Sequence, residues 1–168
     1  MVRRFWMLVL LALVVCGCTG KTPKAEYRAI SWKELANFKY KPSVDPSAKT
    51  PPKPTPLPEE IVCLSGQRLE LSGYMMPIEV EGREVRSFVL VRDQQLCCYG
   101  KMPEMNEWVF VRLQKGQAVD MNMDRPIVVD GTFEVGEDIE EGVVISLYRM
   151  VADSVSEMEG KPTGWIAN

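Results

Sequence analysis

The sequence predicts a mainly β protein, and three observations support that prediction. Between residues 61 and 155, runs of β-branched and aromatic residues alternate with polar residues and are separated by turn-forming stretches. Gly73 and Gly131 lie inside such runs, where a long strand has to bend. No long segment with helical periodicity occurs in this part of the chain. Together these features favour a small OB-like five-stranded barrel, with a β-sandwich as the second choice.

Five segments have this strand-like character, in chain order 67–80, 85–92, 107–113, 125–137 and 142–155. The first alternates Leu69, Leu71 and Tyr74, so Gly73 between them is expected to form a bulge. The stretch between the first two segments is a turn with Gly82 at its tip. The last segment predicts either a strand or a strand that continues into a helical turn.

Two features precede the strands: an N-terminal helix and a proline-rich strap. Trp32, Leu35 and Phe38 recur at helical spacing after Ser31, which predicts one short helix with Ser31 as its N-cap. Residues 42–58 contain 7 of the chain's 12 prolines and are expected to be extended, as a spacer or as a strap.

The N-terminus predicts a lipoprotein signal peptide. Arg3 and Arg4 precede an apolar run, residues 5–15, that is shorter than the roughly 20 residues needed to span a bilayer. Small Gly17 stands before Cys18, so cleavage after Gly17 and lipidation of Cys18 are expected. An ordinary signal peptide cut elsewhere and an uncleaved anchor are the alternatives.

A lipidated chain would be a membrane-anchored lipoprotein in an extracytoplasmic space, on the periplasmic side of a Gram-negative envelope. Thr19 follows the lipidated cysteine in place of an aspartate, which favours the outer membrane. The expected organisation is a signal peptide, an anchor with helix and proline-rich linker, an OB-like barrel domain and a flexible C-terminal tail, at residues 1–17, 18–60, 61–155 and 156–168.

Composition argues against two classes of function. Residues 61–153 carry 9 Lys or Arg against 16 Asp or Glu, so the barrel lacks the positive charge that a nucleic-acid groove needs. The chain has no histidine, the commonest general base, and we therefore expect no enzymatic activity and no catalytic residues. The acidic run 137–141 is interpreted as a solvated turn rather than a calcium loop.

Several blocks together resemble a bacterial extracytoplasmic family, domain of unknown function 3299. The blocks are ISWKELANF, the proline-rich strap, LSGQRLELSGYMMPIE, SFVLVRDQQLCCYGKMPEMNEWVFVRL and RPIVVDGTFEVGE. The resemblance covers residues 31 to about 152. It implies a small secreted or lipid-anchored β protein. Some relatives are encoded beside ABC-type transporter components, including ones linked to zinc uptake, which implies transporter subunits as partners.

Many members of that family carry a Cys-x-His and proline-rich loop before an Asn-Gln pair. Cys97 matches the cysteine, but Tyr99 stands at the histidine position and Asn106-Glu107 replaces Asn-Gln. The chain therefore resembles a subgroup with a Cys-Cys-Tyr-Gly loop, and a histidine-dependent zinc site does not carry over to it.

Three interpretations of Cys97 and Cys98 remain open. In the first interpretation, Cys97 and Cys98 are both small buried residues, or one of them forms a disulfide with Cys63, the third cysteine of the mature chain. Alternatively the adjacent pair forms a strained, reducible disulfide. In the third interpretation the two thiolates bind a soft metal: copper with Met102 or Met105, or zinc with a nearby glutamate such as Glu104 or Glu107.

The sequence-based hypothesis for function follows from the predicted extracytoplasmic location, the acidic barrel and the family resemblance. It is a lipid-anchored accessory or binding protein without enzymatic activity, associated with an envelope transport system and without a cofactor. The alternative hypothesis is a cysteine-dependent metal- or redox-handling module, with zinc or copper as the metal. Residues that would bind a partner are not identifiable from the sequence.

Overall fold

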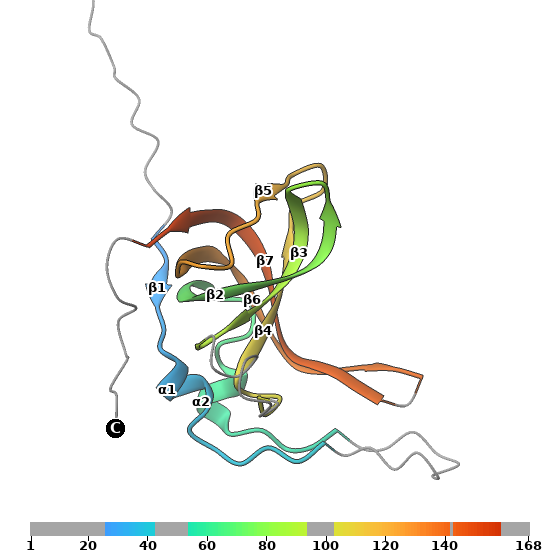
Figure 1. The fold of residues 1–168 in the computed structure, drawn as a ribbon. Coiled ribbons are helices and arrows are strands. Elements are labelled where there is room, and N and C mark those ends of the chain that lie inside the picture. Colours follow the sequence, from blue (N-terminus) through green and yellow to red (C-terminus); the bar gives the residue numbers. More distant parts are fainter. Residues whose placement is uncertain (1–25, 43–53, 94–102, 142, 159–168) are drawn as a thin grey trace, which may run out of the picture.

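The structure is a computed structural model that describes residues 26–42, 54–93, 103–141 and 143–158. Strands dominate these residues, and both helices have only four residues (Figure 1). In chain order the elements are β1 (Arg28–Ala29), α1 (Trp32–Leu35), α2 (Glu59–Val62), β2 (Arg68–Glu81), β3 (Glu84–Val91), β4 (Trp108–Leu113), β5 (Val119–Asp120), β6 (Ile127–Glu140) and β7 (Val143–Glu157). The mainly β prediction is confirmed.

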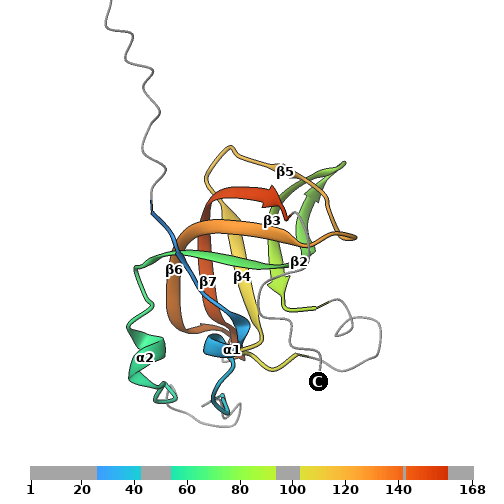
Figure 2. The same ribbon diagram turned by 90° about the vertical axis from the view of Figure 1, so that its left-hand side faces the viewer.

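All described strands belong to one seven-stranded sheet with the order β1-β2-β6-β7-β4-β3-β5. An additional pairing between β2 and β3 closes a ring of hydrogen-bonded strands through β2, β6, β7, β4 and β3. Within that ring β4 and β7 run parallel, whereas the other neighbours are antiparallel. The strands consequently curl around a common interior, as two perpendicular views show (Figures 1 and 2).

The five predicted strand segments correspond to β2, β3, β4, β6 and β7. The turn at Gly82 is also confirmed, with a positive φ of 65° that suits glycine. β7 continues as a strand to Glu157, so the alternative of a terminal helical turn is wrong. Three short elements, β1, α2 and β5, were not expected from the sequence.

Gly73 lies where β2 changes partners, and the predicted bulge at this residue is wrong. Residues 68–73 of β2 pair with β6, whereas pairing with β3 begins at Tyr74. The register shifts of β2 occur later, between Pro77 and Val80. A Cβ on Gly73 would lie 2.5 Å from the backbone oxygen of Val91, so only glycine permits this close approach. In β6, by contrast, a register shift does fall at Asp130/Gly131.

The interior of the ring is filled by side chains that alternate inward along each strand. Large fully buried examples come from every strand of the ring: Leu69, Leu71, Phe88, Leu90, Val111, Phe133, Tyr148 and Met150. The rings of Phe133 and Tyr148 contact each other with centroids 5.5 Å apart. This alternation with period two is the pattern that made the strands predictable.

The N-terminal segment packs into one end of this core. Ser31 caps α1 as predicted, in a reciprocal capping box with Glu34, and it orients Trp32 and Leu35 toward the core. The Trp32 indole donates a hydrogen bond to the Ser72 oxygen at 2.7 Å. Both helices lie at the same end of the ring in the two views (Figures 1 and 2).

The two described ends of the proline-rich segment meet beside β6. The Thr55 hydroxyl donates to the Lys41 oxygen at 2.7 Å, so the chain leaves and returns at the same place. One Glu137 carboxylate oxygen accepts hydrogen bonds from the Tyr40 hydroxyl, at 2.6 Å, and from the Thr55 amide, at 3.2 Å. The described ends of the segment therefore lie against the folded domain, and residues 43–53 between them lie outside the described residues.

Candidate binding face

The outer side of β2 changes from polar to apolar at Gly73. Before it, outward positions hold Arg68, Glu70 and Ser72, where β2 pairs with β6. After it, the outward positions hold Tyr74 and Met76, where β2 pairs with β3. A solvated sheet face normally carries polar side chains, so an apolar stretch on the outside marks a candidate contact surface.

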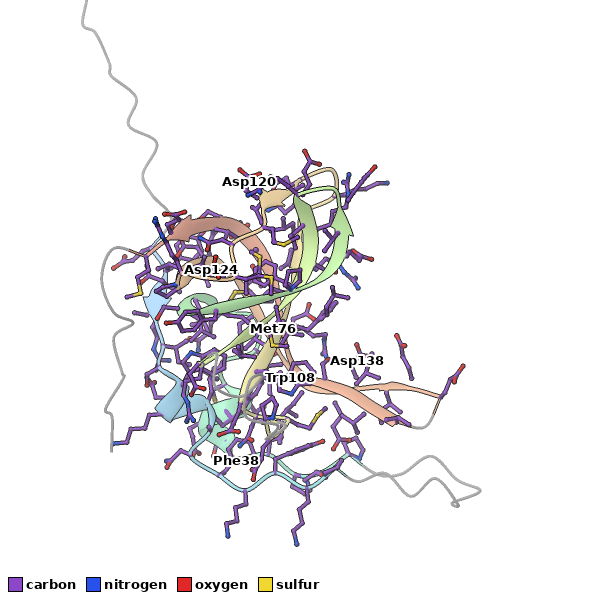
Figure 3. The ribbon with its side chains drawn as sticks, viewed as in Figure 1. Phe38, Met76, Trp108, Asp120, Asp124 and Asp138 are labelled. Atoms are coloured by element: carbon purple, nitrogen blue, oxygen red, sulfur yellow. The ribbon has the colours of Figure 1, made fainter. Side chains whose placement is uncertain are left out.

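The neighbouring strands continue this apolar stretch in two rows across the sheet. One row joins Tyr74, Val91 and Trp108, and the other joins Met76, Val89 and Phe110. We call these six residues of β2, β3 and β4 the binding face. Figure 3 labels Met76 and Trp108, which lie near the middle of the molecule in that view.

The six side chains of the binding face are separate from the interior. Five of them are half-buried, and Val91, between Tyr74 and Trp108, is 1% exposed. Among the described residues, Val91 is buried without belonging to the main core cluster, which agrees with an outward orientation. The six side chains are thus a continuous apolar patch on the outer side of the ring, partly covered, with aromatic groups on two of its strands.

Charged side chains border the binding face at one end. The Arg112 guanidinium lies over the Phe110 ring, 5.6 Å from its centroid. In the adjacent strand, Arg149 donates to the Gly136 oxygen at 2.9 Å and forms an ion pair with Glu134 at 3.4 Å. These cations give the apolar rows a polar rim, the usual anatomy of a protein-binding surface.

The other end of the binding face carries the two ends of the cysteine loop. β3 ends at Val91 and β4 begins at Trp108, two paired residues of the same row, so the described residues on either side of the loop, 92–93 and 103–107, lie next to that row. Arg92 contacts Asp93 at 3.1 Å and Glu107 at 3.8 Å, which links the two sides of the loop. Cys97, Cys98 and Met102 themselves lie outside the described residues, so their proposed metal or redox roles stay predictions.

Asn106 joins the return of this loop to the N-terminal segment. Its side chain is 1% exposed, and its amide nitrogen donates to the Phe38 oxygen at 2.7 Å. The amide oxygen of Asn106 has no hydrogen-bond partner among the described residues. Met105 beside it is half-buried and packs against the core, which fits a packing role; its proposed copper role is untested.

Tyr40 and Tyr148 both have a pKa raised above the ordinary value of a phenol. Burial is the larger cause for Tyr40, and its hydrogen bond to the Glu137 carboxylate adds to it. Burial alone raises the pKa of Tyr148, whose hydroxyl donates to the Leu35 oxygen at 2.9 Å. Both phenols are therefore kept as hydrogen-bond donors that join the N-terminal segment to the sheet, Tyr40 from the segment to β6 and Tyr148 from β7 to the segment, which is a structural arrangement.

A groove of about 520 Å³ lies away from the binding face, between the β2–β3 hairpin, β5 and the end of β7. Met75 and Ile127 lie at its buried side, whereas Asp120 and Asp124, labelled in Figure 3, are exposed at its margin. Its charged groups have both signs, and Arg125 pairs with Glu157 at 3.3 Å. The groove therefore offers a less defined recognition surface than the binding face.

Comparison with known proteins now identifies the family. Residues 32–157 match the DUF3299 family, described as a protein of unknown function. The chain belongs to the DUF3299 family. The resemblance noted in the sequence is confirmed at this level, whereas the Cys-Cys-Tyr-Gly subgroup and the lipoprotein form stay predictions.

A solved DUF3299 structure supports the assignment. The crystal structure of a DUF3299 family protein from Pseudomonas aeruginosa PAO1 is similar with a TM-score of 0.56 and 25% sequence identity, covering 81% of this chain and 99% of that one. An OBody bound to hen egg-white lysozyme has a TM-score of 0.37 and 18% identity, covering 66% and 99%, which is too low to indicate a shared fold. No curated protein matches the chain.

Other predicted site residues of this DUF3299 protein fall in different places. Cys63 is exposed at the C-terminal end of α2, and the disulfide proposed with Cys97 or Cys98 falls on residues outside the described ones. Cys18 also lies outside them. Within the described part of the chain, no group of three potential metal-ligating side chains occurs, and no helix is long and apolar enough to cross a bilayer.

The sequence did contain a signal for the binding face that sequence reasoning missed. SFVLV in β3 and WVFV in β4 are nearly continuous apolar runs, not alternating ones. Such a run predicts a strand that is covered on both faces. Since only one face of these strands lies toward the interior of the ring, the extra apolar residues form the outer surface.

Proposed function

We propose that this DUF3299 protein is a lipid-anchored extracytoplasmic binding protein without enzymatic activity, and that it holds a protein partner on the binding face. The partner is expected to belong to an envelope transport system, as the family resemblance implies. The observation that carries the proposal is the pair of apolar rows on the outside of β2, β3 and β4.

The strand connectivity supports an OB-like five-stranded barrel for this role. The closed ring contains five strands. Their order around the ring departs from their order in the sequence at one point, where β4 pairs with β7 and not with β6, the next ring strand in the chain. In OB folds the outer surface of the second and third strands binds ligands, with help from the first and last hairpin loops. Here that surface is the β3–β4 part of the binding face, and the corresponding loops are the β2–β3 and β6–β7 hairpins.

The composition of the binding face supports a protein partner over a nucleic acid. Its aromatic and aliphatic groups, including Tyr74, Trp108 and Phe110, are typical of the apolar centre of a protein interface. The neighbouring Arg112 and Arg149 are each engaged, one over an aromatic ring and one in an ion pair, and the domain as a whole is acidic. A phosphate backbone would need free cations along a groove.

Photo-crosslinking in cells tests the binding face directly. A photoreactive amino acid at Met76 is expected to form a discrete adduct with one protein, because this position lies in the second apolar row. The matched control is Glu70, which lies on the same strand and the same outer side but before Gly73. Adding Trp108→Ser to the Met76 variant should reduce the adduct at least severalfold.

Equal adducts from Met76 and Glu70, or no adduct from either, would contradict the proposed function. Denaturation curves of the Trp108→Ser variant control for loss of folding. An adduct that persists at full yield in a folded Trp108→Ser protein would also count against the binding face.

The lipid anchor is a separate part of the proposal and has its own test. Cys18→Ser removes the only thiol that can accept the lipid at the expected cleavage site, because the residue before it is Gly17. The variant is expected to lose incorporated labelled palmitate and to appear in the soluble envelope fraction. Cys63→Ser is the matched control and should remain in the membrane fraction. Undiminished palmitate incorporation in the Cys18→Ser variant would rule out lipidation of this cysteine.

A further inference from the structure

The outer part of the β6–β7 hairpin extends beyond the rest of the sheet. We call residues 136–141 and 143–145 the acidic ribbon. The pairing of β6 with β2 ends at Thr132, and the pairing of β7 with β4 begins at Arg149. Beyond these residues β6 and β7 continue to pair with each other as far as Glu140 and Val143. Figure 1 shows this hairpin projecting away from the ring of strands.

Both edges of the acidic ribbon are open to a further strand. Among the described residues, neither β6 beyond Gly136 nor β7 before Ser146 pairs with any strand except the other. A register shift between Val135 and Asp138 separates the ribbon from the body of the sheet, and a second shift, at Asp138/Ile139, lies within the ribbon. Open edges present unpaired amide and carbonyl groups, the template for strand addition by another chain.

The side chains of the acidic ribbon combine exposed β-branched groups with carboxylates. Ile139, Val143 and Ile145 are 38%, 56% and 40% exposed, high values for such residues. Asp138, Glu140 and Glu141 form no ion pair among the described residues. The segment 136–146 contains no lysine or arginine. Glu137 is not part of this set, because it accepts hydrogen bonds from Tyr40 and Thr55.

From this combination we infer that the acidic ribbon docks an extended, positively charged segment of a partner protein by strand addition. The open edge supplies main-chain hydrogen bonds, the β-branched side chains supply apolar contact, and the carboxylates select lysine or arginine. A second copy of the same ribbon is disfavoured, because the two sets of carboxylates would repel each other. The inference does not depend on the binding face, whose residues lie on other strands.

A synthetic peptide of alternating lysine and valine is the probe, with fluorescence anisotropy as the readout on the full chain. It should bind, and a peptide in which glutamate replaces every lysine should not. The triple variant Asp138→Asn, Glu140→Gln and Glu141→Gln is expected to bind the basic peptide about tenfold more weakly. The matched control, Glu60→Gln, Glu84→Gln and Asp124→Asn, makes the same change in net charge at exposed sites elsewhere and should bind like the parent.

A peptide with one central valine replaced by proline separates strand addition from charge attraction alone. Proline removes a main-chain donor and should weaken binding severalfold, and amide exchange within 137–145 should slow only with the unmodified peptide. No binding of the basic peptide at millimolar concentration would overturn the inference. If the ribbon variant and the control variant bind the basic peptide equally, the peptide does not bind at the acidic ribbon. If the proline peptide binds as tightly as the unmodified peptide, binding does not occur by strand addition.

Discussion

Gly131→Ala is expected to lower the free energy of unfolding by about 2–3 kcal/mol, the cost of forcing extra volume into a closed core. A Cβ at this position would collide with the backbone oxygen of Val151 and would lie 2.9 Å from the Met150 Cγ and 3.0 Å from the Ala152 Cα. Two of these three atoms belong to the backbone of β7, which is held by pairing on both sides. The clash therefore cannot be relieved by a rotamer change.

Urea denaturation of the parent and variant proteins measures this effect. Ser156→Ala is the control, because this exposed β7 residue pairs opposite Val128 farther along the same two strands. An exposed substitution of this kind normally changes stability by no more than about 0.5 kcal/mol. A Gly131→Ala protein as stable as the control would mean that β6 and β7 do not approach as closely as described.

Leu35→Ala should destabilise the protein by about 3 kcal/mol, the typical cost of a cavity left by a buried leucine. Leu35 is 0% exposed and packs in the core through the short helix α1, far in sequence from the strands that it contacts. The large loss is expected because the N-terminal segment is part of the folded unit, and α1 alone is too short to be stable.

Lys33→Ala provides the comparison within the same helix. Lys33 is exposed, so its replacement removes no core contact and should change the unfolding midpoint little. Urea midpoints of the two variants can be compared on the full chain. If Leu35→Ala unfolds at the same urea concentration as Lys33→Ala, the segment is attached to the sheet but does not stabilise it.

Local sequence patterns were sufficient for the strands and for the helix N-cap. Leu69 and Leu71 alternate with polar residues, and this period depends only on near neighbours in the chain. Ser31 with Glu34 forms a capping box within four residues, so it too is visible in the sequence. The short strands β1 and β5 have two residues each and carry no such pattern, and they form only because β2 and β3 lie beside them.

Features that depend on distant contacts were not predictable in the same way. Gly73 was expected to be a bulge, yet it is needed because the backbone of Val91 passes within 2.5 Å of where its Cβ would be. The α2 helix follows Pro58 and carries Glu59 and Glu60 in its first turn, a start signal that was hidden by the proline-rich composition. The binding face was missed because an apolar run does not reveal which of its two sides faces the core.

The sequence by itself determined that this chain is built from strands, where most of those strands lie, and that it resembles the DUF3299 family. Those properties follow from alternation, turn residues and motifs within short windows of the chain. Only the tertiary structure decided that Tyr74, Val89 and Phe110 face outward together and that the outer part of the β6–β7 hairpin pairs with no third strand of the described chain. The physical reason is that strand pairing joins residues far apart in sequence, and the pairing sets which side of each strand is covered.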